Sequence, residues 1–166
     1  MASITRTTSN GHVFTIDEED APLVDTRSWY AEADTHHIYI RTHGCGPNKY
    51  SRLHRLLLAA PKGTLVDHIN GDGRDNRRIN LRLCSPAENA RNTRRHRDSK
   101  SPYKGVRVHP DIGRKARFQA TIYRDQRRCS LGYFTDAESA ARAYDAAAKQ
   151  TFGAFAHLNF PEPHAQ

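Results

Sequence analysis

One histidine and several short polar side chains are concentrated in the stretch VDHINGDGRDNRRINLR, residues 66–82. An imidazole is the side chain best matched to removing a proton from water near neutral pH, which makes His68 a candidate general base. Asp67 and, farther along, Asn89 offer oxygen ligands of the kind that Mg²⁺ prefers. These residue types fit metal-assisted hydrolysis of a phosphodiester, in which the ion binds the phosphate and stabilises the leaving oxygen.

The elements that must position these residues can be predicted from local patterns. Short apolar runs at 64–69 and 79–84 predict two strands, and the pairs Asn70-Gly71 and Asp72-Gly73 predict a hairpin-like loop between them. A helix should begin after Ser85, because Pro86 suits the first helical position and Glu88 completes a capping box with Ser85. A strand–strand–helix unit of this size would bring His68, Asn80 and Asn89 together.

This arrangement resembles the HNH endonucleases, the ββα-metal type found in phage and homing endonucleases. The resemblance is carried by LHRLLL at 53–58, VDHINGDGRDNRRINLR at 66–82 and CSPAENARN at 84–92. It implies that His68 is the general base, that Asp67 and Asn89 bind one divalent cation (Mg²⁺, with Mn²⁺ as an alternative), and that Asn80 holds the loop and orients the histidine. Strict strand alternation would aim Asp67 and His68 at opposite faces, so the resemblance also implies a departure from regular strand there.

Several residues of this region have two interpretations. His68 could instead be a surface histidine at a strand end, with the asparagines as turn formers. His54 either faces the site or lies in the core, and the run at 52–59 that contains it fits a strand or a helix. Asn92 either supplements the site or contacts solvent. Four arginines are expected to bind phosphate, although any of them could simply be solvated: Arg74, Arg77, Arg78 and Arg82.

A second pattern begins near residue 101. The runs at 103–109, 117–124 and 127–134 predict three strands, and residues 135–153 predict one long helix. Thr135 and Glu138 form a possible second capping box, and Gly153 would end the helix. Alanines on one face of this helix would let it lie close against the sheet.

Residues 101–161 resemble the DNA-binding domain of the apetala/ethylene-response-factor (AP-two/ERF) family, most specifically in YKGVR, LGYFTDAESAARAYD and LNFP. The resemblance implies a three-stranded antiparallel sheet that enters the major groove and is backed by the helix. By position it implies DNA-facing roles for Lys104, Arg107, His109, Thr121, Tyr123, Arg128 and Ser130. Base specificity does not transfer, because several sheet positions depart from the residues common in that family.

The charge distribution points to a polyanionic partner. The net charge is +8, with 4 Lys/Arg against 7 Asp/Glu in residues 1–50, 12 against 5 in 51–100, and 10 against 6 in 101–166. A basic excess over two thirds of the chain favours binding to nucleic acid. The three cysteines, Cys45, Cys84 and Cys129, contain no CxxC pair, which argues against a zinc site built on cysteine and against a secreted disulfide scaffold.

Taken together, the sequence predicts an α+β protein of two small units, because 37% hydrophobic residues are few for one large core. We expect an HNH nuclease domain at 1–97 (motif core 53–97), a basic linker at 98–102, a DNA-binding domain at 103–161 and a tail at 162–166. The expected function is a metal-dependent DNA endonuclease of homing or phage type. The expected partner is double-stranded DNA, bound by a monomer or a DNA-induced dimer in the cytoplasm of a bacterial host. The alternatives are a DNA-binding regulator with a decayed nuclease domain and, more weakly, an RNA-binding protein.

Overall fold

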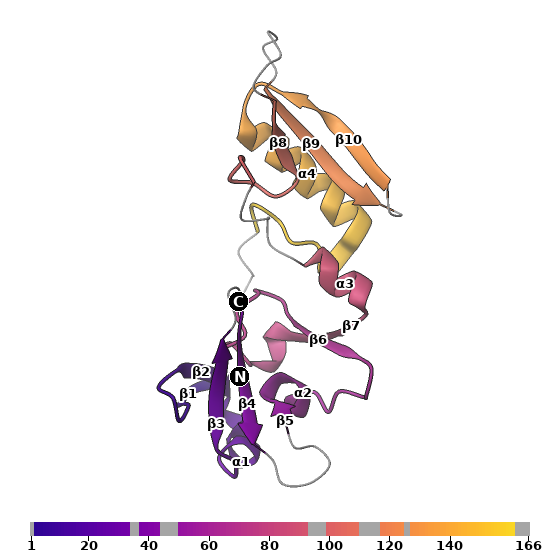
Figure 1. Ribbon diagram of the computed structural model, residues 1–166. Coiled ribbons are helices and arrows are strands. Elements are labelled where there is room, and N and C mark those ends of the chain that lie inside the picture. The colour runs from indigo at the N-terminus through magenta and orange to yellow at the C-terminus, as the bar shows by residue number, and fades with distance from the viewer. Residues whose placement is uncertain are drawn as a thin grey trace. The chain divides into compact units, whose positions relative to one another are not determined.

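The computed structural model describes residues 2–33, 37–43, 50–92, 99–109, 117–124 and 127–161. The chain divides into two compact units, Met1–Asn89 and Ala90–Gln166 (Figure 1). Residue 98 of the predicted linker and the predicted tail at 162–166 lie outside the described residues, so the predicted boundaries at 97 and 102 stay predictions.

The first unit begins with strands that surround an apolar core. The strands are β1 (Ser3–Thr7), β2 (Val13–Asp17), β3 (Trp29–Ala33), β4 (Ile38–His43) and β5 (Tyr50–Arg52). β1 and β2 form an antiparallel hairpin, and β3, β4 and β5 form an antiparallel sheet with β4 in the middle. A 3₁₀ turn, η1 (Glu18–Asp20), and a short helix, α1 (Ala21–Val24), join β2 to β3. Alternation puts Phe14 and Ile16 of β2 into the core with Trp29 and Ile40.

The ambiguous run at 52–59 is a helix, α2 (Leu53–Leu57). Leu53 and Leu57 are buried in the same core, and α2 contacts β4 (Figure 1). The chain then forms β6 (Leu65–His68), the 3₁₀ turn η2 (Arg78–Asn80), β7 (Leu81–Cys84) and α3 (Pro86–Arg91). The predicted capping box of α3 is confirmed: Ser85 N–H donates to the Glu88 carboxylate at 2.8 Å, and Glu88 N–H donates to Ser85 Oγ at 3.3 Å.

The second unit is a sheet packed on one helix. Strands β8 (Val106–Val108), β9 (Phe118–Arg124) and β10 (Arg127–Phe134) form an antiparallel sheet with β9 in the middle, and α4 (Ala137–Phe152) covers one face of it (Figure 1). Small buried side chains, Ala140, Ala141 and Ala148, allow the close approach that the sequence predicted. The 3₁₀ turn η3 (Gly153–Phe155) follows, and the buried Asp145 carboxylate accepts the Phe160 N–H at 2.8 Å, which ties the LNFP segment to α4.

The sequence predicted the end of α4 and misplaced its start. Gly153 ends α4 as predicted, with φ of 53° at the C-cap. The predicted capping box of Thr135 and Glu138 is wrong: the helix begins one residue later, and the Asp136 carboxylate accepts the Ser139 N–H at 2.7 Å.

The mixed α and β content in small antiparallel sheets is confirmed. In the part of the chain that the structure describes, no helix is long and apolar enough to cross a membrane.

Candidate active site and nucleic-acid interface

His68 is the last residue of β6, and its side chain is buried. Its Nε2 lies 3.3 Å from Oδ1 of Asn76, and Nδ2 of Asn76 donates to the carbonyl of Gly73 at 3.1 Å. The second bond fixes the amide orientation, so the atom facing His68 is an oxygen, which only accepts. A neutral imidazole that donates to this oxygen carries its proton on Nε2.

Two other aromatic rings lie beside the ring of His68. The His54 ring lies 4.9 Å from it in an edge-on arrangement, and the Tyr39 ring lies 6.5 Å from it. Burial lowers the pKa of His68, against the opposing effect of its hydrogen bond to Asn76 and of the nearby carboxylates, with Asp67 first among them. Burial also lowers the pKa of His54, to about 3, with smaller contributions from His68 and Arg52. His54 thus lies in the core and also faces the site, which joins the two alternatives left open by the sequence.

Asn80 holds the loop at residues 69–78 in shape. Its Oδ1 accepts the Asn70 N–H at 3.0 Å, and its Nδ2 donates to the Asp75 carbonyl at 2.7 Å. Its backbone carbonyl accepts the N–H of Ile69, the residue after His68, at 2.8 Å. An amide that lies within hydrogen-bonding distance of the His68 ring belongs, however, to Asn76, which is fully buried and which the sequence did not single out.

The same loop is anchored to the strands that precede it. Thr15 of β2 donates its N–H to the Arg74 carbonyl at 2.9 Å and accepts the Asn76 N–H at 2.8 Å. Asp17 Oδ2 accepts the Arg78 N–H at 2.8 Å. Gly73 lies so close to β4 that a Cβ added there would stand 1.9 Å from the carbonyl oxygen of Ile38. The N-terminal strands therefore form the support on which the loop beside His68 is held.

Asp67, the predicted metal ligand, is buried and forms an ion pair with the guanidinium of Arg82. Its Oδ2 accepts two hydrogen bonds from Arg82, from Nε at 2.9 Å and from Nη2 at 2.6 Å. Asp67 and Arg82 are opposite each other in an unbroken β6–β7 ladder, and His68 is opposite Leu81. The expected departure from regular strand at Asp67 and His68 is therefore wrong for this structure.

The donor chemistry of the predicted ligands fits a divalent cation. Asp67 supplies a buried carboxylate that already neutralises a positive charge, and Asn89 supplies an exposed amide on α3. One carboxylate and one amide, completed by water and phosphate oxygens, are a ligand set that suits Mg²⁺. The residues that the structure describes contain no cluster of three or more His, Cys, Asp or Glu side chains able to hold a metal. Asn92, the possible auxiliary residue, is buried.

Each of the four arginines predicted to bind phosphate is paired with a carboxylate. Arg82 binds Asp67 at 2.6 Å, and three others form close pairs on the loop side: Arg74 with Asp72 at 3.0 Å, Arg77 with Asp75 at 2.7 Å, and Arg78 with Asp20 at 2.7 Å. These hydrogen bonds from Arg74 and Arg77 lower the pKa of Asp72 and Asp75. A phosphate would have to compete with these carboxylates.

In the second unit, the face of the sheet opposite α4 carries a polar network. Gln119 lies at its centre: its Oε1 is 3.1 Å from His109 Nε2, and its Nε2 donates to Ser130 Oγ at 3.0 Å and to the Tyr133 hydroxyl at 3.2 Å. Arg107 is exposed and lies opposite Gln119 in the ladder. Tyr123 and Arg128 are exposed and lie opposite each other on β9 and β10. The sequence singled out neither Gln119 nor Tyr133, although alternation with Thr121 and Tyr123 could have indicated Gln119.

Two of the predicted DNA-facing residues are less accessible than expected. Thr121 is buried, so its side chain is not presented to solvent in this structure. Lys104 is half-buried and donates from Nζ to the Arg91 carbonyl at 2.7 Å. Burial lowers the pKa of Lys104 to about 8, against the raising effect of Asp145.

Comparison with known proteins assigns a similarity to each part. Residues 59–91 match a family model described as HNH endonuclease. The chain is 48% identical over 61 residues to an AP2/ERF and B3 domain-containing protein of Oryza sativa subsp. japonica, covering 37% of this chain and 16% of that protein. It is 48% identical over 66 residues to ethylene-responsive transcription factor 3 of Nicotiana tabacum, covering 38% of this chain and 27% of that protein. The match thus spans less than a third of either relative, and no solved structure matches the chain.

Proposed function

We propose that this protein is a metal-dependent endonuclease that hydrolyses phosphodiester bonds in double-stranded DNA. The observation that carries the proposal is the coincidence of the HNH endonuclease match with the buried pair of His68 and Asn76. A buried histidine whose ring is held by a hydrogen bond, at the end of a strand, is arranged as a general base is.

In the proposed reaction, the imidazole of His68 accepts the proton of the water that attacks phosphorus. Asn76 keeps the ring in place through Nε2, and Asn80 keeps the loop that carries Asn76 in shape. Asp67 and Asn89 would hold the divalent cation. The Arg82 guanidinium, which now bonds the Asp67 carboxylate, would then either move away or share that carboxylate with the cation. When bound, such a cation stabilises the negative charge that develops on the phosphate and the leaving oxygen.

The second unit would hold the DNA. Its exposed sheet face carries Arg107, Tyr123 and Arg128, and the AP2/ERF similarity supports a role in binding duplex DNA. A small catalytic unit makes few contacts with DNA, and an attached binding unit raises its effective concentration at the substrate. More specifically, we propose a homing or phage endonuclease that works in the cytoplasm of a bacterial host.

A second candidate function is a DNA-binding regulator that does not cleave. Two observations favour it: the Asp67 carboxylate is engaged by Arg82, and one of the matched relatives is a transcription factor. In that case Asp67 would serve the fold by neutralising Arg82, and no metal would be needed.

Incubation of supercoiled plasmid DNA with the full chain separates the two functions. We expect nicking with Mg²⁺ or Mn²⁺, none with excess chelator, and a loss of at least about a hundredfold in rate for His68→Ala, because a general base contributes roughly 10²–10⁴-fold. His12→Ala is the matched control, because His12 bonds Thr8 through its backbone N–H and carbonyl. DNA binding without metal-dependent nicking on plasmids of varied sequence would contradict the nuclease and favour the regulator.

A further inference from the structure

Arg52 is an exposed arginine at the junction of β5 and α2, outside the segment that matches the HNH family model. The arginines at 74, 77, 78 and 82 are all paired with carboxylates. Arg52, by contrast, forms no ion pair and donates no side-chain hydrogen bond within the described part of the chain. Its charge and its N–H donors are therefore available to a ligand.

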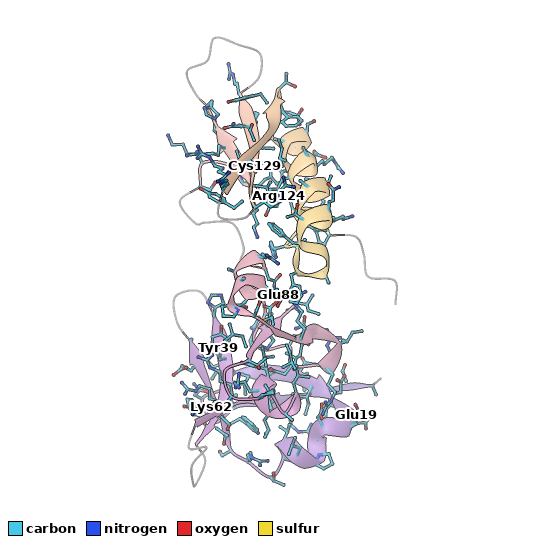
Figure 2. The ribbon with its side chains drawn as sticks, turned by 90° about the vertical axis from the view of Figure 1, so that its right-hand side faces the viewer. Glu19, Tyr39, Lys62, Glu88, Arg124 and Cys129 are labelled. Atoms are coloured by element: carbon cyan, nitrogen blue, oxygen red, sulfur yellow. The ribbon has the colours of Figure 1, made fainter. Side chains whose placement is uncertain are left out.

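An aromatic ring holds this guanidinium near the candidate general base. The guanidinium carbon of Arg52 lies 4.5 Å from the centroid of the Tyr39 ring, a cation–π distance. The Tyr39 ring in turn lies 5.7 Å from the His54 ring and 6.5 Å from the His68 ring (Figure 2 labels Tyr39 in the N-terminal unit). Arg52 is thus separated from His68 by a single side chain.

The local charges leave this position ready for an anion. Arg52 stands directly opposite Arg41 in the β4–β5 ladder, and like charges in opposite positions destabilise a sheet. Arg41 is paired with Glu32, which neutralises one of the two arginines and leaves the other uncompensated. An anion bound by Arg52 would compensate the second of these two charges.

We propose that Arg52 binds a backbone phosphate of the DNA strand that is presented to His68. A guanidinium offers several N–H donors to phosphate oxygens. Because the Tyr39 ring already restricts the orientation of the Arg52 guanidinium, less side-chain entropy is lost when it binds a phosphate. The location of this contact at the scissile strand rests on the proposed function, whereas the contact between Arg52 and DNA can be tested without cleavage.

The test measures binding of the full chain to a short DNA duplex of arbitrary sequence, in chelator, over a series of salt concentrations. The logarithm of the association constant falls with the logarithm of the salt concentration, and loss of one phosphate contact makes this slope shallower by about one. We therefore expect Arg52→Gln to have a shallower slope and to bind about tenfold more weakly at low salt. Arg52→Lys should recover the slope, because it restores the charge. Tyr39→Phe should bind like the original protein, and Tyr39→Leu should bind more weakly, because only the former keeps a ring under the guanidinium.

Arg27→Gln is the matched control, because Arg27 is also exposed and its guanidinium bonds the Leu23 carbonyl. If Arg52→Gln and Arg27→Gln have the same slope, Arg52 does not contact phosphate and the inference fails, whether or not the protein cleaves DNA. If Arg52→Gln alone lowers the slope while the original protein nicks no plasmid, the contact stands and the nuclease proposal fails. Plasmid nicking slowed by Arg52→Gln but not by Arg27→Gln places the contact at the scissile strand.

Discussion

His54 is a buried histidine whose Nδ1 has no hydrogen-bond partner in the described structure. Its pKa of about 3 in the folded protein lies below the value of about 6.5 expected when the chain is unfolded. Between these values the unfolded chain binds a proton that the folded chain does not. The contribution to stability is complete above about pH 6.5 and is lost as the pH falls toward 3, at up to roughly 1.4 kcal/mol per pH unit.

We therefore expect His54→Phe, which keeps a ring against His68, to flatten the dependence of the unfolding free energy on pH between about 6 and 4. Urea denaturation at several pH values measures this dependence. An unchanged slope in the variant would mean that His54 titrates freely in the folded protein and is not buried as a neutral ring.

The chemistry of individual residues was partly readable from the sequence. His68 and Asp67 stand out by type, and the arginines stand out by charge. Asn76 does not, because nothing in the local sequence separates it from Asn70 or Asn80; only the fold shows which amide reaches the His68 ring. The pairing of Arg78 with a carboxylate was equally hidden, since its partner Asp20 lies 58 residues away in the chain.

At the scale of elements, the loop beside His68 depends on its close approach to β4 at Gly73. A Cβ at this position would meet the Ile38 carbonyl oxygen, a backbone atom that cannot turn aside. Gly73→Ala should lower the unfolding free energy by about 3 kcal/mol, the upper end of the range for overpacking, and should slow plasmid nicking. Gly63→Ala is the control, because Gly63 has φ of +87° but open space around it, so only a conformational cost of roughly 1 kcal/mol is expected. Equal losses of stability in the two variants, measured by chemical denaturation, would show that the loop does not depend on this contact.

Elements with strong local signals were predicted well. Ser85, Pro86 and Glu88 mark the start of α3 because a capping box is made by residues three apart. The second box is wrong because Asp136, next to Thr135, is a better N-cap than threonine, so the helix begins one residue later. The run at 52–59 could not be assigned from periodicity, and its helical form follows from packing Leu53 and Leu57 into the core beside β4.

For the whole molecule, the net charge of +8 favours a polyanionic partner, but it does not indicate which cations would contact that partner. The +7 of residues 51–100 includes arginines whose charge is already balanced within the fold. The sequence also favoured two small units, because a modest apolar content supports thin cores, and the chain forms separate apolar clusters around Phe14 and Ile40 and around Ala120 and Ala140. Strand alternation places Thr121 on the same face as the exposed Tyr123, yet Thr121 is buried, and its hydroxyl lies 3.5 Å from the Gly105 carbonyl.

A division of labour between the two units predicts that binding and cleavage can be lost separately. Arg107→Ala removes an exposed cation from the sheet face of the second unit, and it should weaken binding to duplex DNA by about tenfold and lower the salt slope by about one. At saturating protein its single-turnover nicking rate should equal that of the original protein, since His68, Asn76 and Asp67 are untouched. His68→Ala should show the reverse, with unchanged binding and no nicking. Anisotropy titrations and single-turnover plasmid assays on the full chain measure both quantities, and the loss of nicking at saturation by Arg107→Ala would contradict the assignment of catalysis to the first unit alone.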